Sequence, residues 1–166
     1  MKGLVIQMLQ FFVDFMPEWP KWRLWWLVRH KHLVGVFIAV IKDGQILLVK
    51  KKAGVVTGNS LPGGGLDYGN TVGEQVAREL EEETGLIAET FRLIEVSKNV
   101  AHRDLHLLFL VEDFGGDPNL KDNLEIGEAF FVPIEDVGKY LKGDFLNMAQ
   151  KAIKFYKALK NLSMLA

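Results

Sequence analysis

The pattern of apolar and polar residues changes character near residue 33. Residues 1–16 are apolar around most of a helix, with one narrow polar stripe, and such a helix buries most of its circumference. From residue 33 onward, short apolar runs separated by Gly, Pro and Asp replace this pattern, as is typical of strands and turns. The change predicts two parts: an N-terminal extension, residues 1–32, and a domain that covers residues 33–166.

The first part of this domain reads as a β-hairpin. Residues 33–41 form a continuous apolar run, which predicts a strand buried on both faces. The turn Lys42-Asp43-Gly44 follows, and residues 45–51 supply the second strand. Later in the chain, another apolar run over 105–111 predicts a central strand.

The remaining elements are shorter or less regular. Residues 86–100 predict one long strand or two, 113–125 a surface loop, 128–132 a further strand and 134–141 a short helix. Asp144 is expected to cap a C-terminal helix. On that helix the positions expected to face the core are Leu146, Ile153, Tyr156 and Leu159. Strands interrupted by one helix and closed by another predict an α+β fold with a mixed sheet flanked by helices.

A Gly-rich turn and an acidic helix stand in the middle of the domain. Thr71 and Glu74 have the spacing of a capping box, so this helix should begin near residue 71, and Gly85 marks its end. Residues three and four apart share a helix face. Glu79, Glu82 and Glu83 therefore point the same way, which costs a few tenths of a kcal/mol per pair unless a cation compensates.

Such a cluster has two interpretations. A run of charges is most often a solvated helix face. Alternatively, carboxylate oxygens suit Mg²⁺ or Mn²⁺, which bind a few carboxylates and complete their shell with water and substrate phosphate. The preceding residues Gly63, Gly64 and Gly65 favour the second interpretation, because they let the backbone approach a ligand closely.

The whole segment resembles the Nudix box, in which Gly, five residues, Glu and seven residues precede Arg-Glu-apolar-x-Glu-Glu-x-Gly-apolar. The matching residues are Gly64, Arg78, Glu79, Leu80, Glu82, Glu83, Gly85 and Leu86. One position departs: Asn70 stands where the pattern has its first glutamate. In the family that glutamate mainly braces the loop against the box arginine. Glu74, one helical turn before Arg78, is a candidate replacement.

The resemblance implies a Nudix α/β/α sandwich and metal-dependent hydrolysis of a pyrophosphate bond in a nucleoside diphosphate derivative, by water attack at phosphorus. It implies Mg²⁺ or Mn²⁺ held by Glu79, Glu82 and Glu83. Glu82 is also a catalytic candidate, and Arg78 is expected to pair within the box rather than clamp phosphate. For the general base we choose Glu125 over Asp122 and Glu128, the neighbouring acids of a later loop.

Substrate binding is predicted at Gly63, Gly64 and Gly65. Lys51 is a candidate phosphate ligand, no better favoured than its neighbours Lys50 and Lys52, and the three lysines could instead form a solvated strand edge. ADP-ribose-like compounds, nucleotide sugars and nucleoside triphosphates all remain open, because the segment around His102 lacks the proline or tyrosine that marks two subfamilies. Asn70 also suggests an alternative from another class, a catalytically weakened nucleotide-binding sensor.

The composition of the chain limits the binding partners that we expect. A formal charge of −1 argues against binding a nucleic acid polymer, and the absence of cysteine is compatible with a reducing cytoplasm. No apolar run reaches transmembrane length. The extension is nevertheless rich in Trp and basic residues, and no acidic residue lies between Trp19 and Lys42. It is expected either to lie in a membrane interface, as a peripheral contact, or to pack on its own domain or in a homodimer.

Overall fold

The computed structural model describes residue 17 and residues 32–52, 57–99, 104–118 and 124–163. Contacts divide the chain into two units, residues 1–32 and 33–166. The predicted helix over residues 1–16 and the Trp-rich basic segment lie outside the described residues, so their predicted membrane or dimer contacts stay predictions. Among the helices that the structure describes, none is long and apolar enough to cross a membrane.

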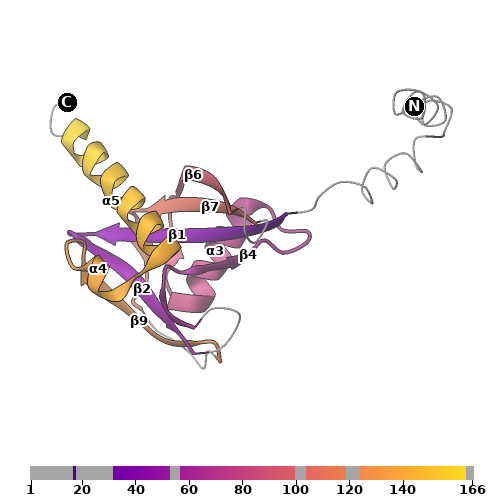
Figure 1. Ribbon diagram of the computed structural model, residues 1–166, viewed down its shortest axis with the longest axis horizontal. Helices are drawn as coiled ribbons and strands as arrows, with labels where there is room; N and C mark the ends of the chain where they lie inside the picture. The colour runs from indigo at the N-terminus through magenta and orange to yellow at the C-terminus, as the bar shows by residue number, and fades with distance from the viewer. Residues whose placement is uncertain (1–16, 18–31, 53–56, 100–103, 119–123, 164–166) are drawn as a thin grey trace, which may run out of the picture. The chain divides into compact units, whose positions relative to one another are not determined.

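A mixed, seven-stranded sheet forms the centre of the second unit (Figure 1). Its strands are β1 (Leu33–Lys42), β2 (Gln45–Lys51), β3 (Gly58–Ser60), β4 (Gly63–Gly65), β6 (Arg92–Asn99), β7 (Asp104–Val111) and β9 (Ile126–Pro133). β1 runs parallel to β7 and antiparallel to β2 and β4. β2 pairs with β3 and β9, and β6 with β7, all antiparallel.

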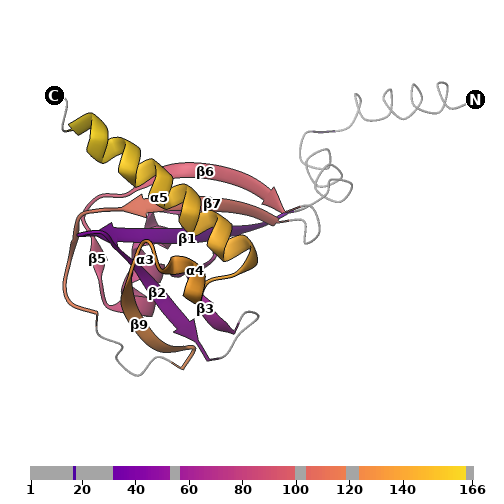
Figure 2. The same ribbon diagram turned by 60° about the vertical axis from the view of Figure 1, so that its left-hand side comes forward.

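Helices cover both faces of this sheet. Figure 2 shows α5 (Gly143–Ser163) crossing β1 and β7 on one side, with α3 (Val72–Thr84) behind them. Alternate residues of β1 feed the two cores: Ala39 and Ile41 pack with α5, whereas Ile38 and Val40 pack with α3. All four are at most 1% exposed, as expected for a strand between two helical layers. The predicted α/β/α sandwich is confirmed.

Several local predictions are confirmed as well. The first hairpin turns through Asp43 and Gly44, whose φ angles of 50° and 73° are those of a two-residue turn that suits the strand twist. The apolar segment after α3 divides into two strands, β5 (Ile87–Ala88) and β6. In α5 the predicted inward positions are buried or partly buried in the core, Ile153 most fully.

Three predictions need correction. The segment predicted as a loop over 113–125 contains a short strand, β8 (Phe114–Gly115), which pairs with β5 in a separate two-stranded sheet. The short helix α4 covers only Val137–Tyr140. Asp144 lies inside the first turn of α5 instead of capping it, because the helix already begins at Gly143. An acid there still interacts favourably with the helix dipole.

Candidate active site

The ends of α3 are fixed by local hydrogen bonds. The Thr71 hydroxyl accepts from the Glu74 N–H at 3.3 Å, and the Glu74 carboxylate accepts from the Thr71 N–H at 2.7 Å, which completes the predicted capping box. At the other end Gly85 takes a φ of 76° and donates its N–H to Glu81. The Glu74 carboxylate therefore binds Thr71 at the N-cap, and the suggestion that it pairs with Arg78 is wrong.

Glycine in β4 lets this strand lie directly against the acidic face of α3. A Cβ on Gly63, whose φ is 141°, would stand 2.0 Å from the Val36 carbonyl oxygen. A Cβ on Gly64 would stand 2.7 Å from Glu79 Oε1. At Gly63 the obstacle is backbone and no side chain fits, whereas at Gly64 a side chain would have to displace the Glu79 carboxylate. The glycines therefore keep the backbone N–H and C=O groups of β4 beside the carboxylates.

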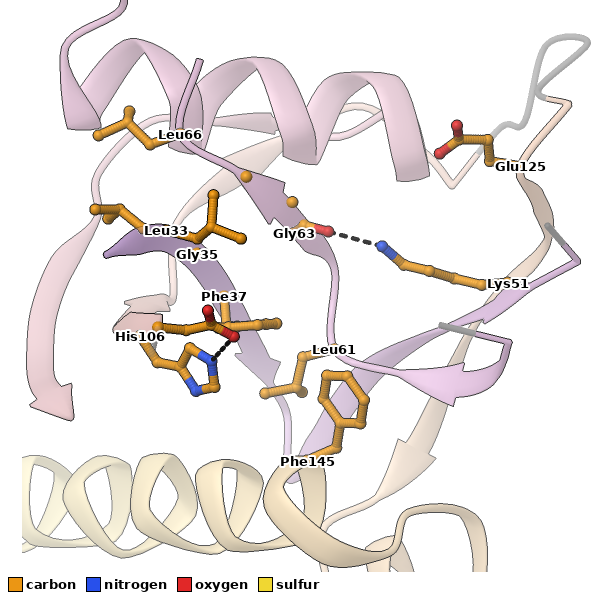
Figure 3. Close-up of a pocket in the computed structure, with 14 residues that line it drawn as sticks. Leu33, Gly35, Phe37, Lys51, Leu61, Gly63, Leu66, His106, Glu125 and Phe145 are labelled. Atoms are coloured by element: carbon orange, nitrogen blue, oxygen red, sulfur yellow. Dashed lines mark hydrogen bonds and ion pairs between the residues drawn. The ribbon is translucent and has the colours of Figure 1, made fainter. Parts of the chain in front are cut away.

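Glu83 is the most enclosed of the three box glutamates, at 5% exposed. Its Oε2 accepts from the Gly63 N–H at 2.7 Å, and its Oε1 lies 2.7 Å from Lys51 Nζ. The same ammonium donates to the Gly63 carbonyl at 2.7 Å (Figure 3). Burial raises the pKa of Glu83 above its ordinary value, although the charge of Lys51 opposes this shift.

Glu79 lies one helical turn earlier and is 9% exposed. It accepts from Gln75 Nε2 at 2.8 Å and from Arg78 Nη2 at 3.3 Å. Burial raises the pKa of Glu79, and the nearby charge of Glu83 raises it further, while Arg78 opposes both. Two partly desolvated carboxylates on adjacent turns therefore favour additional positive charge in the space between them.

Arg78 pairs within this segment, as expected. Its guanidinium binds Glu82 Oε2 at 2.9 Å and Asp67 Oδ2 at 2.5 Å. Asp67 lies in the loop between β4 and α3, so its carboxylate braces that loop against Arg78, the task assigned to the first glutamate of the box. The carboxylate that is missing at Asn70 is thus replaced by that of Asp67, three residues earlier. Asp67 is the only acid between Gly65 and Thr71, and this was the signal that sequence reasoning overlooked.

Gln75 is a second residue that the sequence analysis missed. Its side chain is fully buried and accepts from Asn70 Nδ2 at 3.0 Å. Its amide nitrogen donates to the Gly65 carbonyl at 2.6 Å and to Glu79. Asn70 therefore joins the brace through Gln75, and the loop is tied to β4 and to α3 together.

The predicted site residues come together around one cavity of about 370 Å³. Those that line it are Lys51, Gly63, Gly64, Gly65, Arg78, Glu79, Glu82, Glu83 and Glu125. A second cavity, of about 360 Å³, shares Lys51, the three glycines and Glu125 and continues toward Phe37, His106 and Phe145. Figure 3 shows Lys51 and Glu125 at one end of this second cavity, with Phe37, His106 and Phe145 toward α5. Of the other two acids considered as the base, Asp122 lies outside the described residues and Glu128 lines neither cavity.

The donor atoms of the first cavity fit a hard divalent cation. Within the described ranges, no three acidic or histidine side chains already stand in the arrangement of a metal site. Instead, the Lys51 ammonium bridges a carboxylate oxygen of Glu83 and the Gly63 carbonyl. Both are oxygen ligands of the kind that Mg²⁺ and Mn²⁺ use. A cation is thus already accommodated there, and Glu79 and Glu82 border the same space.

Residues 31–159 match the NUDIX domain family. The chain therefore belongs to the Nudix family, and it is a Nudix pyrophosphohydrolase, an enzyme that acts on phosphoanhydride bonds. Enzymes of this family generally use divalent metals such as Mg²⁺.

Relatives support this assignment over most of the domain. An ADP-ribose pyrophosphatase of Methanocaldococcus jannaschii is 36% identical over 134 residues, which cover 77% of this chain and 75% of that protein. An 8-oxo-dGTP diphosphatase of Escherichia coli is 33% identical over 89 residues, 51% of this chain and 69% of that protein. The structure of a MutT Nudix hydrolase from Burkholderia pseudomallei superposes with a TM-score of 0.65 at 26% identity, covering 74% of this chain and 98% of that one.

Proposed function

We propose that this protein hydrolyses the pyrophosphate bond of a nucleoside diphosphate derivative, with ADP-ribose-like compounds as its foremost substrates. The observation that carries the proposal is the pair of cavities that meet at β4. One is bordered by carboxylates and the other by aromatic and aliphatic side chains. A nucleoside diphosphate derivative has a charged diphosphate, which suits a metal-binding cavity, and a flat base, which suits the aromatic cavity. The similar enzyme from M. jannaschii is named for ADP-ribose.

The metal would be held by Glu79, Glu82 and Glu83, with the Gly63 carbonyl beside them. When bound, Mg²⁺ supplies charge neutralisation at the phosphoryl oxygens and a lowered pKa for a coordinated water. Gly64 and Gly65 leave room for the diphosphate to approach the backbone of β4. Lys51 reaches the same place and can neutralise a phosphate oxygen once its ammonium is released from Glu83.

Proton transfer is assigned to Glu125. It lines both cavities from the segment that precedes β9, which supports a role in taking a proton from the water that attacks phosphorus. Arg78 is a positioning residue in this scheme, because its guanidinium holds Glu82 and Asp67 and thereby fixes the loop that follows β4.

A hydrolysis screen tests the proposal directly. The full chain is incubated with Mg²⁺ or Mn²⁺ and a panel of ADP-ribose, nucleotide sugars and nucleoside triphosphates, and the products are identified. We expect AMP and ribose 5-phosphate from ADP-ribose, at the highest kcat/KM of the panel. Failure to cleave any of these compounds would overturn the proposal, and preferential cleavage of triphosphates would overturn the substrate assignment.

The alternative of a weakened nucleotide sensor loses its motivation in this site. It was suggested by Asn70, yet Asp67 and Gln75 brace the same loop. Replacing Asn70 by Glu should therefore change turnover little. A large gain in turnover for Asn70→Glu would restore the sensor hypothesis.

A further inference from the structure

The second cavity contains a polar group that the hydrolysis mechanism does not use. Asp104, at the start of β7, lines this cavity. Its Oδ1 is buried and has no hydrogen-bond partner in the part of the chain that the structure describes. Its Oδ2 lies 3.9 Å from His106 Nε2, beyond hydrogen-bond range. A buried acceptor without a donor is unfavourable, and the Asp104 side chain as a whole is 23% exposed. A rotation of the carboxylate would therefore let Asp104 accept a hydrogen bond from a ligand in this cavity.

The register of the strands sets the distance between Asp104 and the diphosphate site. Gly35 of β1 pairs with Gly65 of β4 on one side and with His106 of β7 on the other. Neighbouring strands lie about 4.8 Å apart, so β7 is about 10 Å from β4. The sugar and base of a nucleotide together extend over a similar distance, so a diphosphate beside β4 would bring the base within reach of Asp104 and His106.

The wall between these two ends offers flat apolar surface. Phe37 meets the His106 ring edge to face, with centroids 5.0 Å apart, and meets Phe145 in the same way at 5.8 Å. Gly35 contributes only backbone there, since a Cβ would come within 3.1 Å of the Phe37 ring. Aromatic rings beside bare backbone suit a planar heterocycle, because bases stack on aromatic side chains.

We propose that Asp104 selects a purine base carrying an exocyclic amino group. A carboxylate can only accept hydrogen bonds, and the amino groups of adenine and guanine are donors, whereas a bare carbonyl edge would face the carboxylate with like polarity. The purine, with two rings, offers the larger area to Phe37. This inference rests on the proposed function only in placing the diphosphate beside β4.

Equilibrium binding tests the inference without requiring turnover. Nucleoside 5′-diphosphates are titrated into the full chain with Mg²⁺, in two pairs that differ by one amino group: adenine against unsubstituted purine, and guanine against hypoxanthine. In the wild type, we expect removal of the amino group to weaken binding at least fivefold in one pair. In Asp104→Ala that ratio should drop at least threefold, with similar affinities for the two members.

Two further variants separate recognition from structure. Asp104→Asn keeps the size of the side chain and can present either an amide NH₂ or a carbonyl, so the ratio should drop there too even if Asp104→Ala fails to fold. Asp117→Ala removes an exposed carboxylate that lines neither cavity and should leave the ratio unchanged. Wild-type ratios below fivefold in both pairs, or a ratio that persists in the Asp104 variants, would overturn the inference. Because the titration measures binding and the hydrolysis screen measures turnover, either proposal can fail while the other holds.

Discussion

The two long helices of the domain bury very different residues. Of the 21 residues of α5, the buried ones are all apolar: Met148, Ala149, Ala152 and Ile153. The 13-residue α3 buries Val76 and Leu80, but also polar and charged side chains: Gln75, Glu79, Glu83 and Thr84. Both helices pack on the same sheet, so the contrast does not come from their position in the fold.

Burying a carboxylate costs free energy unless hydrogen bonds and opposite charge compensate. In α3 the compensation is incomplete, because the pKa values of Glu79 and Glu83 remain raised. Stability alone explains the composition of α5, whereas the buried charges of α3 are explained by the proposed binding of a cation and a phosphate. Substitutions on α3 should therefore change activity first, and substitutions on α5 should change stability first.

The largest expected effect is on catalysis, in Glu83→Gln. Losing this charge removes a proposed metal ligand, and we expect kcat/KM to fall by about 10³, or about 4 kcal/mol of transition-state stabilisation. The urea midpoint should change little, because Gln keeps an acceptor for the Gly63 N–H and because the lost attraction to Lys51 is offset by no longer burying a charged carboxylate. Steady-state kinetics and urea unfolding measure the two quantities.

The control is Glu81→Gln, an exposed carboxylate on the same helix, which should leave kcat/KM within about twofold. Near-normal turnover in Glu83→Gln would contradict the site assignment. A stability loss as large as the activity loss would remove the contrast between the helices.

The next effect is on stability, in Ile153→Ala. Ile153 is 8% exposed and belongs to the core between α5 and the sheet. Truncating a buried Ile to Ala costs about 2 to 4 kcal/mol through lost burial and a residual cavity. We expect a lower urea midpoint with an unchanged kcat/KM for the folded protein.

The control is Lys154→Ala, a change at the exposed neighbouring residue, which should shift the free energy of unfolding by less than about 0.5 kcal/mol. A loss of kcat/KM in folded Ile153→Ala would contradict the idea that α5 serves stability and α3 serves activity.

Sequence reasoning predicts α5 and the limits of α3 because their signals are local. Apolar spacing predicts the buried face of α5, and the capping box and Gly85 each mark one end of α3 with residues at that end. Asp144 shows the limit of such reasoning, since a cap and a first-turn acid differ by one residue and look alike in sequence.

Sequence reasoning predicts most residues of the site, including Lys51 and Glu125 outside the box, but not how they contact one another. The glutamates and glycines of the box are close in sequence, and the structure gathers them at one cavity. The pairing of Lys51 with Glu83 and the position of Asp104 depend on strand register between distant segments. Asp67 is local, yet no spacing rule marks it, because the bracing carboxylate can come from any loop position that reaches Arg78.

A smaller effect is expected on metal affinity, in Lys51→Met. The ammonium of Lys51 occupies the oxygen atoms of Glu83 and Gly63 that a divalent ion would share. Without this competitor, Mn²⁺ should bind about tenfold more tightly in the absence of nucleotide, a change of about 1.4 kcal/mol. Titration followed by electron paramagnetic resonance of free Mn²⁺ measures the affinity. Lys50→Met, which changes an exposed neighbouring lysine that lines neither cavity, is the control and should change nothing. Unchanged or weaker Mn²⁺ binding in Lys51→Met would show that lysine and metal do not compete.

The smallest effect is on the acid dependence of stability, through Glu74. The backbone N–H and hydroxyl of Thr71 lower the pKa of Glu74 below its ordinary 4.5. A lowered folded-state pKa means that the ionised cap stabilises the protein above about pH 4.5 and that this contribution is lost as pH falls through the folded value. Glu74→Gln, neutral at every pH, should be less stable than the wild type near neutral pH and approach it in acid. Urea midpoints measured from about pH 7 down to about pH 2.5, well below the ordinary pKa of a glutamate, would follow this convergence. Glu81→Gln, which has no part in the cap, should show no convergence. A constant difference between wild type and Glu74→Gln across this range would mean that the charge of Glu74 does not stabilise the N-terminus of α3.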